Sequence, residues 1–323
     1  MFNIVSINTS KITDKQWDDF ISQSDNGTLF HTRKFLSYHP KKRFKDTSLI
    51  IFKKEKIFSL FPAAIIVRNG QKILSSHPGA SYGGFVHKSD LKLQDAFSIV
   101  EGLIEYAKNQ KCDSIELTQV PIIYQSKYSN YLDFALIKNG FEYKRREISS
   151  VVQLDIPEGK LLSTYRATAR TATKKSMKLG IEVRECEEFE NYYEILKKNL
   201  SLRHNVQPTH TLSELKRLKK LFPDEIRLWG AFKGKKLIAG VCNFSANPKV
   251  VLAFYISHLE KYQEYRAVNL LFYEIMKEYQ TEGFKFLDFG IFTVNMDPNW
   301  GLARFKENFG ARGIFRDTFR IKL

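Results

Sequence analysis

Apolar side chains recur along this chain with two periods, one typical of helices and the other of strands. The longest helical period runs over 89–109, where apolar residues return every three or four positions before a buried-strand pattern at 114–120. The first half is predicted to contain helices at 14–24, 32–39, 89–109 and 128–138, and strands at 48–53, 57–67, 73–76, 114–120 and 141–154.

The same order of elements recurs in the second half. It is predicted to contain helices at 160–179, 189–202, 213–221, 267–282 and 302–309, and strands at 227–232, 236–244, 250–256, 284–289 and 313–323. Strands around Glu116 and Asp288, and turns at Gly140 and Gly310, match between the halves. We therefore predict an α/β protein with mixed sheets, built from two copies of one unit.

The boundary is expected where Pro157 and Gly159 interrupt both patterns. This gives an N-terminal domain over 1–155 and a C-terminal domain over 156–323, with the closing strand free to pack back on the first domain. A length of 323 residues agrees with two domains at roughly 150 residues each.

Composition excludes several classes of protein. With 43% hydrophobic, 14% aromatic and 27% charged residues, the chain is neither disordered nor of low complexity. The longest uncharged apolar stretch, 57–67, contains Pro62 and is too short to span a membrane, and the first residues lack a secretory pattern. Cys112, Cys186 and Cys242 are far apart. We expect a cytoplasmic protein with reduced, packed cysteines.

The charge favours anionic partners. The formal net charge is +16, which attracts phosphates, nucleic acid or an acidic membrane surface without choosing among them. Arg166, Arg170, Lys174 and Lys178 recur every four residues on one predicted helix, and no acid occurs over 160–178. This stripe is either an anion-binding surface or a face docked on acids of the other domain.

Several reaction classes lack their motifs. The seven histidines show no ligand spacing with acids or cysteines, so we predict no metal site. The chain contains no G-x-S-x-G, P-loop or G-x-G-x-x-G motif, which argues against a serine hydrolase, a P-loop NTPase and a standard dinucleotide enzyme.

The element order of each half is that of the GNAT acyltransferase fold, and short motifs extend the likeness. They are 26–32 (NGTLFHT), 164–166 (TYR) through 178–180 (KLG), 237–240 (LIAG), 287–290 (LDFG) and 301–310 (GLARFKENFG). With these motifs the whole chain resembles the FemAB-like family of peptidoglycan aminoacyltransferases, which carry two GNAT-like domains in tandem. The resemblance implies amide formation on an amino group of a cell-envelope precursor, either peptidoglycan or a surface glycan.

The resemblance also suggests site residues. Phe305 and Lys306 match the family's pair at the point of transfer, where Lys306 would steady the developing oxyanion or the tRNA ribose end. Asp288 ends an apolar strand, so it either caps an element or orients reactive groups. The candidate substrate-binding residues are Arg304, Tyr255, Tyr82, Gly83, Arg203 and His39. Tyr82 and Gly83 lie in a glycine-rich turn that either admits a ligand or simply joins two strands.

The donor is predicted from a missing motif. GNAT enzymes that use coenzyme A have a glycine-rich loop before the crossover helix, but 257–266 contains no glycine, and Glu260 and Glu264 would repel a pyrophosphate. We expect aminoacyl-tRNA as co-substrate and no permanently bound cofactor. Other expected partners are an anionic envelope precursor and, peripherally, the membrane surface.

Two alternatives stay open. One is an acyl-CoA-dependent N-acyltransferase that modifies an amino sugar of a surface polysaccharide. The other is a non-catalytic RNA-binding protein that uses the basic helix alone.

Overall fold

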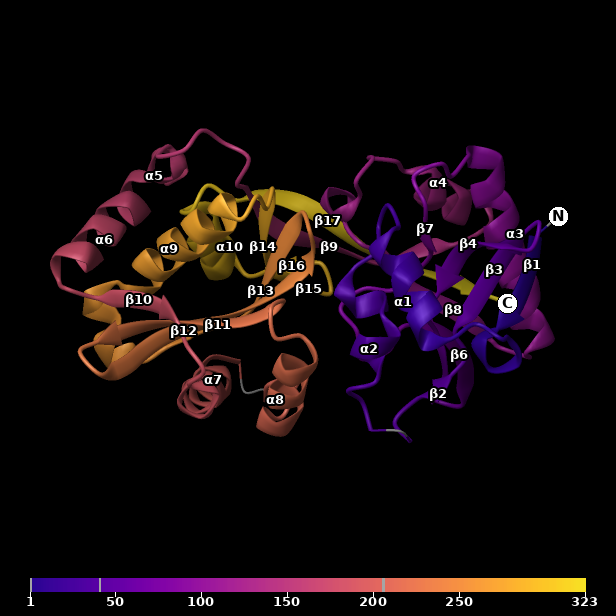
Figure 1. Ribbon diagram of the computed structural model, residues 1–323, viewed down its shortest axis with the longest axis horizontal. Helices are drawn as coiled ribbons and strands as arrows, with labels where there is room; N and C mark the ends of the chain where they lie inside the picture. The colour runs from indigo at the N-terminus through magenta and orange to yellow at the C-terminus, as the bar shows by residue number, and fades with distance from the viewer. Residues whose placement is uncertain (1, 41, 205–206) are drawn as a thin grey trace. The chain divides into compact units, whose positions relative to one another are not determined.

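The computed structural model of the chain describes residues 2–40, 42–204 and 207–323, and the side chains of 202–204 lie outside this description. Two compact units are present, one formed by 1–147 with 315–323 (unit 1) and one by 148–314 (unit 2). The chain passes between them within β9 (Glu142–Gln153) and again within β17 (Arg312–Lys322) (Figure 1). The boundary predicted from the sequence lies at 155/156.

Unit 1 contains two sheets. One has the order β1-β3-β4-β7, and the other runs β2-β5-β6-β8 and continues to β17. The strands are β1 (Phe2–Ser6), β2 (Lys45–Asp46), β3 (Leu49–Lys53), β4 (Lys56–Phe61), β5 (Ala64–Arg68), β6 (Gln71–Ser76), β7 (Val86–His87) and β8 (Ser114–Thr118). The helices are α1 (Asp14–Ser22), α2 (Arg33–Leu36), α3 (Leu93–Asn109) and α4 (Tyr131–Lys138).

The core of unit 1 follows the predicted helical period. Ala96, Ile99, Val100, Leu103 and Ala107 of α3 are buried at spacings of three and four, against the sheet. The strand predicted at 57–67 is wrong as one element, because Pro62 lacks an N–H group and the chain changes sheet there, from β4 to β5.

Unit 2 is one mixed sheet with helices on both faces. Its strands follow the order β10-β11-β12-β13-β14-β9, in which the β13–β14 pair is parallel. They are β10 (Glu182–Glu185), β11 (Ile226–Lys233), β12 (Lys236–Asn247), β13 (Val250–His258) and β14 (Phe286–Ile291), followed by the small hairpin β15 (Thr293–Val294) and β16 (Asp297–Pro298). The helices are α5 (Leu161–Thr164), α6 (Ala167–Lys178), α7 (Phe189–His204), α8 (Leu212–Leu221), α9 (Ala267–Thr281) and α10 (Trp300–Glu307).

Helix α9 crosses over between the parallel strands β13 and β14 and packs on the sheet, with α6 alongside it, whereas α7 and α8 pack on the opposite face (Figure 1). The single helix predicted over 160–179 is divided in the structure, because Tyr165 and Arg166 are extended and separate α5 from α6. Arg166 therefore precedes α6 instead of lying within it.

The parallel ladder in unit 2 is short. Only Val250–Leu252 of β13 pairs with Phe286–Asp288 of β14, although β13 continues to His258. Beyond this ladder, the last residues of β13 pair only with β12 and line the cavity described below.

Two glycines that end helices offer a matched test of how closely α10 packs against α5. Gly283 and Gly310 follow α9 and α10 with φ of 88° and 83°. A Cβ at Gly283 would meet open space, but one at Gly310 would lie 2.8 Å from the Thr164 carbonyl oxygen. We predict that Gly283→Ala lowers the free energy of unfolding by about 1 kcal/mol and Gly310→Ala by at least about 1 kcal/mol more. Urea unfolding measures both, and equal losses would contradict the close packing of Gly310 on Thr164.

Candidate active site

Helix α10 presents the candidate site residues of unit 2. The Asn299 side chain caps it by accepting a hydrogen bond from the Leu302 N–H at 3.0 Å. Ala303, Lys306 and Phe309 then face inward at helical spacing and are buried. A lysine therefore occupies a position that an apolar residue would normally fill.

Lys306 is held by backbone carbonyls. Its side chain lies inside unit 2, with 2% of the residue exposed. The Nζ donates hydrogen bonds to the carbonyl oxygens of Gly290 at 2.7 Å and Ile291 at 2.8 Å. An ammonium carries three N–H groups, so one donor is left for a ligand after these two described bonds.

Asp288 fixes the turn that supplies these carbonyls. The residue is fully buried, and its Oδ1 accepts from the Gly290 N–H at 2.7 Å and from the Ser149 hydroxyl at 2.5 Å. Gly290 adopts φ of 73°, which a side chain would disfavour. Asp288 thus shapes the peptide segment that holds Lys306.

Burial changes the proton affinity of Lys306. Loss of water around the ammonium lowers the pKa of Lys306 from 10.5 to about 7, while the negative charge of Asp288 acts in the opposite direction. The group can therefore gain or lose a proton near neutral pH, as a proton-transfer catalyst requires.

A cavity of about 540 Å³ adjoins this helix. Phe305 and Leu302 of α10 line it together with the last residues of β13 and the first turn of α9. Polar side chains reach it as well, namely Asn199, His258, Gln263, Arg266, Asn269 and Asn299. An apolar wall with a few polar groups is typical of a small-ligand site.

Two amides of the loop between β13 and α9 are bonded within the loop itself. Residues Glu260–Tyr265 form a short 3-10 helix. The amides of Tyr262 and Arg266 donate to the carbonyls of Leu259 and Gln263 inside this loop. They are therefore engaged, whereas a phosphate-binding loop turns its N–H groups toward the ligand.

Of the other residues predicted for unit 2, only Phe305 is found among the described lining residues of the cavity. Phe305 lines the cavity and also packs at 5.2 Å from the Phe309 ring. Arg304 is exposed on the outer side of α10. Tyr255 does not line the cavity. Its hydroxyl accepts a hydrogen bond from the His210 N–H at 3.1 Å and lies 2.8 Å from His210 Nδ1. Arg203 belongs to α7, but its side chain lies outside the described residues.

In unit 1 the predicted residues Tyr82, Gly83 and His39 are all buried around the glycine-rich turn. Tyr82 packs against the Tyr124 ring, and a Cβ on Gly83 would come within 2.3 Å of the Ser76 carbonyl. The close approach at Gly83 is thus made by the protein's own backbone.

A second cavity, of about 450 Å³, opens beside this turn in unit 1. Arg68, Lys144 and Arg145 line it, and the Glu116 carboxylate lies 3.3 Å from Arg68 and 2.6 Å from Lys144. Burial by itself would raise the pKa of Glu116, but Lys144 and Arg68 outweigh this effect and lower the pKa. Positive charge exceeds negative charge in this cavity, which suits an anionic ligand.

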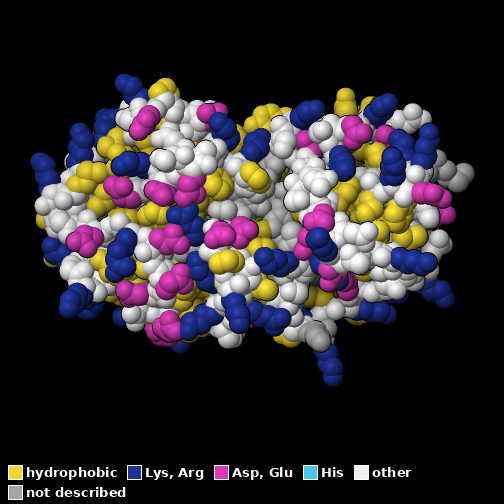
Figure 2. Space-filling view, viewed as in Figure 1, with side chains coloured by type: hydrophobic (Ala, Val, Ile, Leu, Met, Phe, Trp, Pro, Cys, Tyr) yellow, Lys and Arg dark blue, Asp and Glu magenta, His cyan; other side chains and the backbone are white. Residues whose placement is uncertain are grey.

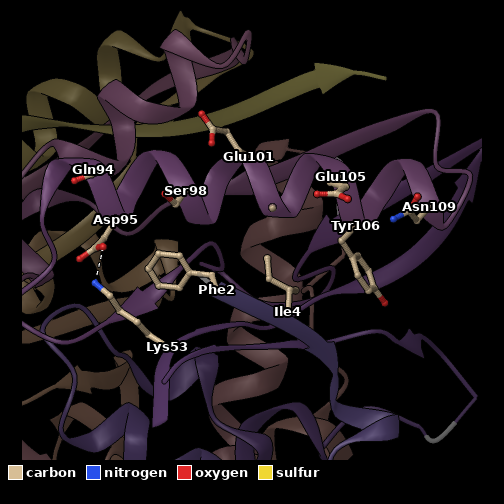
Figure 3. Close-up of a pocket in the computed structure, with 11 residues that line it drawn as sticks. Phe2, Ile4, Lys53, Gln94, Asp95, Ser98, Glu101, Glu105, Tyr106 and Asn109 are labelled. Atoms are coloured by element: carbon tan, nitrogen blue, oxygen red, sulfur yellow. Dashed lines mark hydrogen bonds and ion pairs between the residues drawn. The ribbon is translucent and has the colours of Figure 1, made fainter. Parts of the chain in front are cut away.

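A further cavity in unit 1, of about 650 Å³, is lined by none of the predicted residues. It follows the outer side of α3, where Glu101 and Glu105 stand along the helix and Asp95 meets Lys53 at 2.6 Å (Figure 3). Acidic side chains at a helix surface are usually solvated, so we assign it no function.

The basic stripe lies at the surface of unit 2. Arg166 pairs with Glu307 at 2.8 Å, Arg170 is half-buried, and Lys174 and Lys178 are exposed. Figure 2 shows Lys and Arg side chains gathered over the region where Figure 1 places α5 and α6.

Comparisons with known proteins agree with this architecture. Residues 163–307 match the protein-family model described as an acetyltransferase (GNAT) domain. Most of unit 2 thus matches the GNAT domain. No curated protein matches the sequence.

Solved structures extend the GNAT likeness to both units. FemX shares 14% identity and a TM-score of 0.76 over 97% of each chain. L-PGS from Bacillus licheniformis shares 11% identity, with a TM-score of 0.59 over 94% of this chain and 90% of that one. A tandem GNAT protein from the clavulanic acid biosynthesis pathway has 11% identity and a TM-score of 0.55, covering 100% and 98%.

The predicted tandem GNAT fold with mixed sheets is confirmed, as is the resemblance to the FemAB-like family at the level of fold. Among the helices that the structure describes, none has the length and apolar character needed to cross a bilayer. Trp300 and the asparagines that line the unit 2 cavity were not predicted as site residues. Asn299, a capping residue directly before a helical pattern, was the signal available for one of them.

The burial of Lys306 predicts a pH-dependent stability. Its pKa is about 7 in the folded protein and 10.5 when unperturbed, so the unfolded chain binds the proton more tightly. The free energy of unfolding should therefore rise from pH 7 to 10 by up to about 1.4 kcal/mol per pH unit relative to Lys306→Met. Urea unfolding across this range measures the slope. Lys235→Met, at an exposed turn, is the control. If the free energy of unfolding changed with pH equally in Lys306→Met and the unmutated protein, Lys306 would not be a buried, titrating amine.

Proposed function

We propose that this acyltransferase moves an aminoacyl group from tRNA to an amino group of a cell-envelope precursor. The observation that carries the proposal is the buried ammonium of Lys306, held by two backbone carbonyls with one donor to spare. Lys306 does not itself line the unit 2 cavity, but the preceding residue, Phe305, does. Acyl transfer needs such a preorganised donor, because negative charge develops on the carbonyl oxygen under attack.

The chemistry follows from the proton balance. The neutral acceptor amine attacks the ester carbonyl carbon, a C–N bond forms, and the carbonyl oxygen becomes an oxyanion near the free N–H of Lys306. The C–O bond to the ribose then breaks. The amine gives up one proton and the ribose oxygen gains one. Lys306, with its pKa near 7, is suited to give a proton from its ammonium to the leaving oxygen and then to take up the proton that the amine releases.

Two features support an aminoacyl ester over coenzyme A as the donor. The amides of Tyr262 and Arg266 are engaged within their own loop, and Glu260 and Glu264 would repel a pyrophosphate. Members of the FemAB-like family, which the sequence resembles, take the acyl group from aminoacyl-tRNA.

The acceptor is proposed to be anionic. The cavity of unit 1 gathers Arg68, Lys144 and Arg145 around one carboxylate, and arginine binds phosphate in a bidentate manner. A phosphate-bearing envelope precursor has this chemistry. A lipid-linked precursor would make the membrane surface a peripheral partner.

Lys306→Met should lower kcat by about 100- to 1000-fold and leave the fold intact, because the side chain is replaced by one of similar length without a donor. Turnover is followed by mass spectrometry with charged tRNA and a nucleotide-linked cell-wall peptide, and Lys235→Met is the control. Full turnover in Lys306→Met would remove this residue from the reaction.

The donor is settled by parallel reactions containing aminoacyl-tRNA or acetyl-CoA. An aminoacyl mass increment made only with charged tRNA supports the proposal. Acetyl transfer from acetyl-CoA to an amino sugar would support the alternative acceptor and donor, and RNA binding without any product would indicate a non-catalytic protein.

Arg145→Gln should raise the KM for an anionic acceptor about three- to fivefold at low salt and leave kcat unchanged, because an exposed cation adds a modest attraction. The matched control is Lys138→Gln, an exposed cation outside this cavity. An equal KM for the Arg145→Gln and unmutated proteins would place the acceptor elsewhere.

A further inference from the structure

Trp300 is an exposed aromatic side chain next to the candidate site. It begins α10 with 73% of its surface exposed, and the residues on either side of it, Asn299 and Gly301, line the unit 2 cavity. Arg304 follows four positions later and is exposed on the same side of the helix. An indole so exposed is costly in water and is typical of a binding surface.

The outer side of α10 continues onto α6. Glu307 pairs with Arg166 at 2.8 Å, and the Asn308 carbonyl accepts from the Arg166 amide at 2.9 Å. The Thr168 hydroxyl also lies 3.4 Å from the Asn308 side chain. The C-terminal end of α10 is therefore joined to the N-terminal end of α6.

This surface carries an excess of positive charge. Arg170, Lys174 and Lys178 extend along α6, and the structure gives none of them a carboxylate partner among the described residues. Like charges four residues apart repel, so the stripe is unfavourable until an anion neutralises it.

We infer that this surface binds the single-stranded 3′ end and adjoining stem of an RNA donor. The inference rests on the proposed function and adds the location and contacts of the carrier. The docking face is defined by Trp300, Arg304, Arg166, Arg170, Lys174 and Lys178. Bases of the single strand stack on the Trp300 indole, and the cations neutralise backbone phosphates.

A membrane fits this face less well than RNA does. The sides of α6 that carry small residues, Ala169, Thr173 and Ser176, are buried in the protein, so the helix turns a polar, basic side outward. An interfacial membrane helix needs an apolar side facing the lipid. The hairpin before α10 does expose Val294 and Met296, and for this reason anionic vesicles form one arm of the test.

The binding test uses the full chain and a deacylated RNA hairpin with a single-stranded 3′ end. The affinity for this RNA is measured by fluorescence anisotropy at several salt concentrations. Trp300→Ala should raise Kd about tenfold, and Trp300→Phe should restore most of the affinity. The double variant Arg170→Gln/Lys174→Gln should reduce the salt slope by about 2. Lys235→Gln, an exposed cation at the turn between β11 and β12, is the matched control.

A transfer assay separates this inference from the proposed function. With charged full-length tRNA the double variant should lose about tenfold in kcat/KM, but with a minimal aminoacyl-adenosine donor it should match the unmutated protein.

Unchanged RNA affinity and salt slope in the variants overturn the docking face, even if transfer from tRNA occurs. Loss of binding to phosphatidylglycerol vesicles with RNA binding intact overturns it in favour of a membrane contact. RNA binding that depends on this face without any transfer supports the inference and overturns the proposed function.

Discussion

The removal of the Lys306 ammonium from water is the constraint around which the end of unit 2 is organised. A buried lone cation is strongly unfavourable unless polar atoms surround it. The carbonyls of Gly290 and Ile291 accept its hydrogen bonds, and Asp288 supplies a nearby negative charge while it holds the Gly290 amide. The β13–β14 ladder ends at Leu252 and Asp288, and the register of β14 against β9 shifts between Asp288 and Ile291, in the segment whose carbonyls hold Lys306.

Both units contain a parallel strand pair joined by a crossover helix, but among the described residues the buried ammonium of Lys306 has no counterpart at the matching position of unit 1. In unit 1, β6 and β8 form the parallel pair and α3 crosses between them. Leu136, which stands four residues before Gly140 as Lys306 stands before Gly310, is buried in the core. Unit 1 instead places charge on the other face of its sheet, around Glu116. Under the proposed function, unit 2 supplies the proton and oxyanion chemistry and unit 1 binds the anionic acceptor.

The surface of unit 2 carries unbalanced positive charge. The stripe on α6 is repulsive by itself, and only Arg166 has a described carboxylate partner in Glu307. Because the remaining cations lie on a helix joined to the one that carries Arg304 and Trp300, the charge that makes this part of the molecule unfavourable in isolation is suited to a flexible polyanion with exposed bases.

The sequence by itself determined the order of elements, the duplication and the apolar faces, because period and turn residues are local properties. Hence α3 and α9 are found close to their predicted positions, whereas 57–67 and 160–179 divide where Pro62 and an extended Arg166 break the period. The motif around Lys306 could be found in the sequence, but its surroundings could not. Only the tertiary structure brings Gly290 and Ile291 to the Lys306 ammonium, turns Tyr255 toward His210 and leaves Trp300 in solvent. Such contacts join residues distant along the chain, and burial, which decides a proton affinity, exists only once they have packed.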